Sequence, residues 1–212
     1  MPGPAAVAET AAATLAHIGG RFEEAERLYR QAAAGMARHG SPHAEGMMVV
    51  ALTTLRAGQG RLPELVPRLR EVYTAFGPQA GDLLAVALAA AGDEREAREI
   101  LDRAGPLRTD YFFKVFATFR AMTLVMLGER AGVDELYAAL LPYRDAPPPS
   151  SGFTVAVRPV ARTLGELALL LGLEEEAAGH FARAEAIAVQ WGSPLGRPDD
   201  QARGPRRGRG PT

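Results

Sequence analysis

The stretch from Leu164 to Ala184, LGELALLLGLEEEAAGHFARA, decides how this chain folds. Its apolar residues recur at helical spacing on both sides of Gly172, so it predicts two short amphipathic helices that meet at this glycine. Gly165 is small enough to let the two helix backbones approach closely, and Phe181 fills the space beside it. We therefore expect a helical hairpin that packs against neighbouring hairpins.

Weaker copies of this hairpin precede it in the chain. A predicted helix over residues 5–18 leads into a second helix, and the same alternation of amphipathic helix and turn continues to the last copy. The glycines at the predicted turns lie 40, 32, 36 and 44 residues apart, and they are Gly20, Gly60, Gly92, Gly128 and Gly172. Five hairpins in series favour stacking of each unit on its neighbours.

The packing positions of the last hairpin match those of a tetratricopeptide repeat. The matching residues are Leu164, Gly165, Gly172, Ala177, Phe181 and Ala184. The predicted fold class is therefore all-α: a right-handed, tetratricopeptide-like α-solenoid of about five helix pairs over residues 1–195. Because the spacings depart from the period of about 34 residues of an ideal array, a globular all-α bundle is the alternative.

The composition fits such an array and excludes several classes of function. Apolar residues make up 47% of the chain and aromatic residues only 7%, and Ala and Leu, which favour helices, supply most of the apolar content. The net charge of −1 gives the whole molecule no bias toward nucleic acid or membranes. The absence of Cys removes disulfides and thiolate zinc sites, and it is compatible with a cytoplasmic protein. We see no signal peptide and no apolar run of membrane-spanning length.

Residues 196–212 differ in composition from the rest of the chain. They contain five Arg and two Asp among Gly and Pro, with almost no apolar residue. Such a segment cannot bury enough apolar surface to fold, so we expect a disordered tail. Its charge is a weak signal for contact with a phosphate backbone, and direct binding of nucleic acid is not expected.

Three motifs in the C-terminal half occur together in a known group of proteins. Residues 136–143 read LYAALLPY, residues 164–172 read LGELALLLG, and residues 176–181 read EAAGHF. With the sequence around them, residues 120–195 resemble the C-terminal helical-repeat region of large actinobacterial ATP-binding transcriptional regulators. These are the LuxR-type, bacterial-transcriptional-activator-domain and adenylate-cyclase-linked kinds. The resemblance implies a regulatory role, in which the array relays binding of a partner or ligand to ATPase and output domains.

The chain departs from these regulators in what it lacks. It has no G-x-x-x-x-G-K-[ST] phosphate-binding loop, Lys114 is its one lysine, and no helix-turn-helix can be separated from the repeats. After residues 191–194 the regulators continue with another helix, whereas this chain turns into its Arg-, Gly- and Pro-rich tail. We expect either a stand-alone fragment of such a regulator or a truncated gene product.

No residue pattern indicates a reaction, a cofactor or a metal. His39 and His43 are four residues apart, but Gly40-Ser41-Pro42 lies between them, and no third ligand is evident. The sequence shows no partner that would make His180 a catalytic base. The glutamate runs at 23–24 and 174–176 open helices, where they suit the positive end of the helix dipole.

The leading hypothesis is a non-enzymatic protein-interaction module. Stacked helix pairs leave a concave surface that is lined by the first helix of each pair, and a protein or peptide partner would bind there. The repeat template assigns six residues to this surface: Met47, Asp82, Thr118, Met122, Arg162 and Glu166. The alternative is a small-molecule sensor with an apolar pocket near Tyr111–Phe119, where most of the aromatic residues gather.

Overall fold

The computed structural model describes residues 4–107, 109–150 and 155–195, and these residues are almost entirely helical. The α-helices are α1 (Pro4–Ile18), α2 (Phe22–Arg38), α3 (Ala44–Gly58), α4 (Val66–Phe76), α5 (Gly81–Ala91), α6 (Glu94–Arg103), α7 (Phe113–Leu127), α8 (Val133–Leu140), α9 (Val160–Leu171) and α10 (Glu174–Gln190). Short 3-10 helices η1 (Leu62–Leu65), η2 (Gly77–Ala80) and η3 (Leu141–Tyr143) and the strands β1 (Pro149–Ser150) and β2 (Val155–Ala156) complete the order. The predicted all-α class is confirmed.

The glycines that the sequence assigned to turns separate the two helices of each pair. All five adopt positive φ, from 63° at Gly128 to 83° at Gly92 and Gly172. Glycine reaches this left-handed conformation without steric cost, so each turn ends one helix and aims the chain back along it. Asp93 caps the start of α6, because its side chain accepts a hydrogen bond from the backbone N–H of Glu96 at 3.3 Å.

The second pair differs from the simple hairpin that the sequence predicted. Its second half begins as η1 and only then continues as α4. Pro63 lies in η1 and Pro67 in the first turn of α4, where a missing N–H costs little. Two prolines four residues apart cannot both stand in a first turn of one α-helix, so the segment is divided.

The last pair shows the close approach that the sequence predicted. A Cβ atom built on Gly165 would lie 2.7 to 2.9 Å from ring atoms of Phe181, which is inside van der Waals contact. Leu164, Ala177 and Ala184 are buried in the same hairpin. The glycine therefore lets the aromatic ring of α10 rest directly on the backbone of α9.

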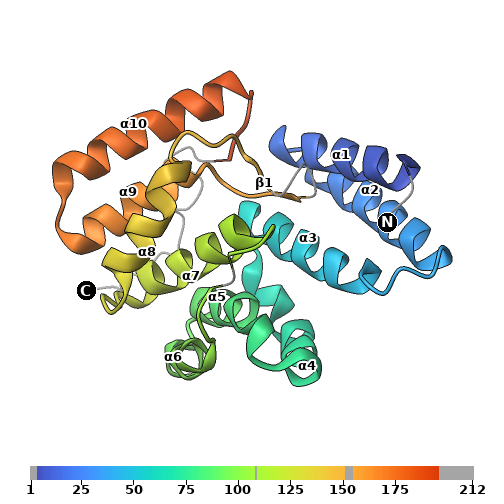
Figure 1. Ribbon diagram of the computed structural model, residues 1–212, viewed down its shortest axis with the longest axis horizontal. Coiled ribbons are helices and arrows are strands. Elements are labelled where there is room, and N and C mark those ends of the chain that lie inside the picture. Colours follow the sequence, from blue (N-terminus) through green and yellow to red (C-terminus); the bar gives the residue numbers. More distant parts are fainter. Residues whose placement is uncertain (1–3, 108, 151–154, 196–212) are drawn as a thin grey trace, which may run out of the picture.

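The helix pairs follow one another around an arc, from α1 and α2 through α4, α5 and α6 to α9 and α10 (Figure 1). One large buried apolar cluster joins the helices from α1 to α7, and a second joins α7, α8 and α9. Phe119 of α7 belongs to the first cluster and Leu124 to the second. Helix α7 therefore connects the two halves of the molecule.

The arc is closed by a segment that the sequence did not place there. Strands β1 and β2 pair antiparallel, with Pro149 opposite Ala156 and Ser150 opposite Val155, and this ribbon lies beside α1 and α3 (Figure 1). Val155 and Ala156 are fully buried, and Val155 and Val157 belong to the large N-terminal cluster. Residues 147–149 are all proline, which bars both a helix and a central strand there. Pro149 meets that limit because it is the first residue of a two-residue strand.

The residues that follow α10 also reach the first two pairs. A Cβ atom built on Gly20 would lie 2.7 Å from Cγ of Pro194, and one built on Gly58 would lie 3.0 Å from Cδ2 of Leu195. We call Ser193–Leu195 the closing segment. The first and last pairs are therefore bridged, unlike the separated ends of an extended solenoid. The predicted disordered tail, 196–212, lies outside the described residues.

Replacing Gly165 with Ala should destabilise the chain, because the added methyl group collides with the ring of Phe181. We expect the free energy of unfolding to fall by about 1 to 3 kcal/mol, as in other overpacked sites. Chemical denaturation of both proteins measures this change.

Gly179→Ala is the matched control, because Gly179 lies in α10 and has no atom within 4 Å of an added Cβ. This substitution should stabilise the helix by up to about 1 kcal/mol. Equal effects at both glycines would contradict the close approach, and Phe181→Leu should suppress the cost of Gly165→Ala.

Candidate functional site

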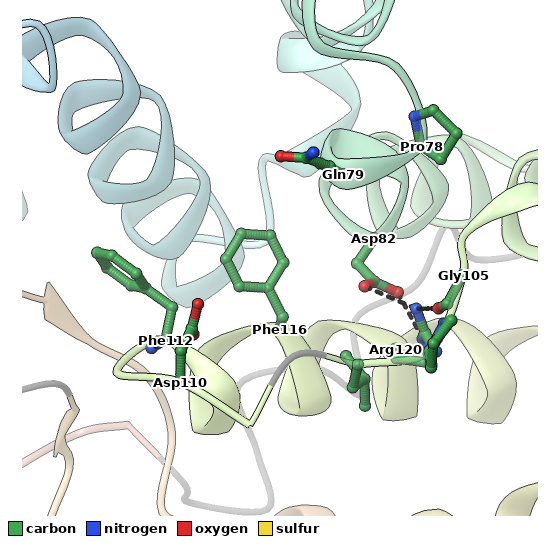
Figure 2. A pocket seen from close by; sticks show the side chains of 10 residues that line it. Pro78, Gln79, Asp82, Gly105, Asp110, Phe112, Phe116 and Arg120 are labelled. Carbon is green, nitrogen blue, oxygen red and sulfur yellow. Dashed lines mark hydrogen bonds and ion pairs between the residues drawn. The ribbon is translucent and has the colours of Figure 1, made fainter.

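A pocket of about 330 Å³ lies between the start of α5, the α6–α7 connection and α7. Its walls combine apolar side chains with a few polar groups, and they are formed by Pro78, Gln79, Asp82, Gly105, Pro106, Leu107, Asp110, Phe112, Phe116 and Arg120. Figure 2 shows Phe112 and Phe116 on one side and the paired Asp82 and Arg120 on the other. This mixture of aromatic faces and convergent polar groups is typical of a small-ligand site.

The polar end of the pocket is an ion pair between two helices. The guanidinium of Arg120 on α7 donates to both carboxylate oxygens of Asp82 on α5, at 2.7 and 3.0 Å. It also donates to the backbone oxygen of Gly105 at 2.9 Å. Arg120 therefore fixes α5, α7 and the connection between α6 and α7 in one arrangement (Figure 2).

Burial governs the charge of this pair. Only 5% of Asp82 is exposed, and removal from water raises the pKa of its carboxyl although Arg120 acts in the opposite direction. Two charges in such a place stabilise the fold only while each has its partner. A ligand group that competes for Arg120 would therefore take away the partner that stabilises the charged carboxylate of Asp82.

The aromatic residues of this region divide into those that line the pocket and those that do not. Phe112 and Phe116 line it, with ring centroids 6.4 Å apart and planes at 90°. Phe119 is fully buried in the core, whereas more than half of Tyr111 is exposed and its ring packs edge-on against Phe112. Of these aromatic residues, the i, i+4 pair Phe112 and Phe116 therefore lines the pocket.

Asp110 positions the aromatic pair at the start of α7. Its side chain accepts a hydrogen bond from the backbone N–H of Phe112 at 3.0 Å. This turn lies just before Phe113, where α7 begins. The N-cap position of α7 is Phe112, which has no side-chain cap bond, so Asp110 turns the chain ahead of the helix without capping it.

The six residues assigned to a concave surface are not gathered on one exposed face. Met47, Thr118 and Met122 are buried, and Asp82 is held in the ion pair with Arg120. Arg162 and Glu166 are less deeply buried and pair with each other at 3.2 Å. In this arrangement four of the six have little surface to offer a partner, so binding of a partner through these residues stays a prediction.

Glu166 has a second partner that the sequence did not indicate. Arg158, between β2 and α9, donates to both oxygens of Glu166 and, at 3.1 Å, to the hydroxyl of Thr163. Burial lowers the pKa of Arg158, although Glu166 favours its charged form. The carboxylate of Glu166 thus ties the chain that leaves the ribbon to the first turns of α9.

A shallower groove of about 630 Å³ lies on the other side of the α6–α7 connection, between α6, α7 and α8. Phe113 lines this groove, whereas the neighbouring Phe112 lines the pocket, and Arg120 borders both. Its rim is charged, with Asp102, Glu135 and Arg98 around an apolar floor. The pocket and the groove therefore share a wall, which is formed by the α6–α7 connection and Arg120.

The remaining candidates for chemistry have structural roles or no companions. His180 lies on α10 and shares a hydrogen bond of 2.9 Å with the hydroxyl of Tyr137 on α8, and burial lowers the pKa of its ring. His39 bonds the backbone oxygen of Gly35 at 2.8 Å, near the end of its own helix.

Within the described residues, no three His, Asp or Glu side chains converge as a metal site requires. In the same residues, no helix is both long and apolar enough to span a bilayer.

Comparison with known proteins gives no relative for this chain. No protein-family model, no curated protein sequence and no solved structure matches it. The resemblance of residues 120–195 to actinobacterial regulators therefore stays a prediction.

Sequence reasoning named Asp82 and the aromatic stretch separately and did not single out Arg120. The spacing that would have joined them is 38 residues between Asp82 and Arg120, about one repeat. An acid and a base on the first helices of two successive pairs is a signal for such a contact. Their burial, however, depends on how closely α5 and α7 pack, which the sequence alone does not give.

Replacing Arg120 with Leu should destabilise the chain strongly, because Asp82 would stay buried without a partner. We expect a loss of about 3 to 5 kcal/mol at pH 7. The loss should shrink as the pH falls, since the raised pKa of the lone carboxyl lets it bind a proton in the folded state sooner than in the unfolded state. Urea unfolding at pH 7 and pH 5 measures both effects.

The double variant Asp82→Leu with Arg120→Leu should recover much of this loss, because no buried charge remains. Arg95→Leu, which breaks the exposed pair with Glu99, should have a far smaller effect. A double variant as unstable as Arg120→Leu alone would show that the ion pair does not carry the effect.

Proposed function

We propose that this chain is a non-enzymatic binding module that senses a small amphiphilic molecule in the pocket between α5 and α7. The observation that carries this proposal is the pocket itself, in which two perpendicular phenylalanine rings face a buried ion pair. Aromatic faces supply apolar contact area, and the Asp82–Arg120 pair supplies a polar end that orients a ligand. A volume of about 330 Å³ suits a small metabolite rather than a large cofactor.

We further propose that the helix pairs are tetratricopeptide-like and that the module is the sensory part, or a fragment, of a bacterial transcriptional regulator in the cytoplasm. The glycine turns, the Gly165–Phe181 contact and the motifs of residues 136–181 support this proposal. A ligand in the pocket contacts α5, α7 and the α6–α7 connection at once. Binding there would stiffen the middle of the array, which is how such a module passes a signal along its length.

A protein partner is the second candidate, and the groove between α6, α7 and α8 is the observation that favours it. This groove is larger and more open to the surface than the pocket, and charged residues surround an apolar floor. Such a surface suits one face of an amphipathic helix. The two candidates are compatible because they use different walls of the same connection.

A thermal-shift screen with small amphiphilic metabolites tests the first candidate. A ligand at 100 times its dissociation constant should add about 2.7 kcal/mol of stability. Phe112→Ala should abolish that gain, because it removes one aromatic wall of the pocket. Isothermal calorimetry on the same hits gives the affinities.

The matched control is Phe113→Ala, which alters the groove but not the pocket. It should leave the ligand-dependent gain intact even if it lowers the basal stability. If a compound still stabilises Phe112→Ala but no longer stabilises Phe113→Ala, its binding site is the groove and not the pocket. A screen in which no compound shifts the transition would count against the sensor and leave the partner as the better proposal.

A further inference from the structure

His17 is buried where two neighbouring helices meet a third part of the molecule, which is itself made of two segments. It lies in the last turn of α1, it is 0% exposed, and its ring packs edge-on against Phe22 of α2 at 5.7 Å. The third part is the end of α3 together with the closing segment. The point at which Gly58 would carry a Cβ atom lies 3.4 Å from Nε2 of His17 and 3.0 Å from Cδ2 of Leu195. The imidazole and the leucine thus share one small space.

Both ring nitrogens of His17 lack a hydrogen-bond partner among the described residues. A buried polar group without a partner is destabilising, so such a group in a native structure calls for an explanation. The ring is held neutral, because burial lowers its pKa to about 3. The site has the geometry of a contact that tolerates only the uncharged form of the side chain.

The charged groups on the surrounding elements do not compensate a charge on this ring. On α2 and the turn before it, Arg21 pairs with Glu24, and Glu26 receives both Arg30 and Arg56 of α3. Each of these charged groups thus has a partner of opposite sign. Burial is the sole cause of the lowered pKa of His17. The closing segment itself, Ser193–Leu195, has no ionisable side chain.

The closing segment is the least anchored of the parts that cover His17. Backbone bonds hold it to the end of α10, from Ser193 N to the oxygen of Ala188 at 2.8 Å, and the Ser193 hydroxyl accepts from Leu195 N at 3.1 Å. Its contacts with the first two pairs are packing contacts, of Pro194 at Gly20 in the first pair and of Leu195 at Gly58 in the second. Helices α1 and α2, in contrast, form one continuous hairpin that also belongs to the large core. Release of the segment is therefore the least costly way to bring water to His17.

We propose that His17 is a pH-sensitive latch: the closing segment docks on the first pair only while the imidazole is neutral, and proton uptake by His17 releases it. The docked segment keeps the arc of helix pairs closed at the end of α10. The latch therefore couples acidity to the connection between the last helix pair and the first. It does not depend on the proposed ligand pocket, which lies between α5 and α7.

The direction of the pH dependence follows from proton linkage. The pKa of His17 is about 3 in the docked state, and it approaches the ordinary value of about 6.5 once the ring meets water. The open state then binds more protons, so docking is complete above pH 6.5 and weakens as the pH falls toward 3. One proton is taken up, so the open fraction should rise about tenfold from pH 7.5 to pH 5.5.

Hydrogen–deuterium exchange of the full chain at pH 7.5, 6.5 and 5.5 tests the latch. After correction for intrinsic rates, the amides of Gly192, Ser193 and Leu195 and those next to Gly20 and Gly58 should lose about tenfold in protection over this range. In His17→Leu, which packs a side chain of similar size but binds no proton, the protection of the same amides should stay constant. An equal loss in the variant and in the native chain would overturn the proposal.

His180→Gln is the control for the other histidine with a lowered pKa, and it should leave the exchange at 192–195 unchanged. A second measurement serves if His17→Leu fails to fold. In nuclear magnetic resonance titrations, the ring of His17 should stay neutral down to pH 4.5 in the native chain, and Leu195→Ala should raise its pKa toward 6.5. A native His17 that titrates near pH 6.5 with the segment docked would equally overturn the proposal.

Discussion

The structure depends on the burial of one short extended segment against the first helix pair. Tyr29 of α2 is completely buried, and its hydroxyl bonds both the hydroxyl of Thr14 at 3.0 Å and the backbone of Ala156. Val155, beside that bond, lies in the N-terminal core. Burial raises the pKa of Tyr29, so this hydroxyl stays protonated and available for hydrogen bonding.

Without the ribbon, α1 and α3 would expose the apolar surface that it covers, and the chain that leads into α9 would have no fixed start. An interaction between residues 127 positions apart in the sequence thus joins elements that a nearest-neighbour array would keep separate.

This closure explains why the candidate site lies in the middle of the chain. The ribbon lies beside α1 and α3, and the closing segment reaches Gly20 and Gly58, whereas the pocket is lined by η2, α5, the α6–α7 connection and α7. The connection between α6 and α7 is also longer than the glycine turns within the pairs, and it spans the gap between α5 and α7 rather than filling it. Arg120 holds that connection through the oxygen of Gly105, so the gap persists as a pocket. The site is therefore a consequence of how the repeats are connected, and its side chains come from residues that a repeat template does not specify.

The sequence predicted local structure well and long-range placement poorly, for physical reasons. The turn glycines, the cap at Asp93 and the contact of Gly165 with Phe181 depend on residues close in sequence, so their patterns are readable. The repeat template also assigned Met47, Thr118 and Met122 to a surface, although the structure buries them. Which face of a first helix is covered depends on the angle between successive pairs, and the template assumes the angle of an ideal array. The ribbon could not be foreseen because a two-residue strand leaves no periodic signal, and its partners on α1 and α3 are remote in the chain.

A buried ion pair and a buried neutral histidine have opposite electrostatic consequences in this fold. Asp82 and Arg120 carry charges that are tolerated because they face each other, so the pair favours one arrangement of α5 and α7 and penalises all others. His17 is neutral because it is buried and its ring nitrogens have no hydrogen-bond partner among the described residues, so its surroundings penalise a proton rather than a movement. The ion pair favours one arrangement at the proposed pocket, whereas the histidine makes the proposed latch sensitive to a proton. Among the described residues, the two sites share no contact that joins their charges, so the two proposals can be tested independently.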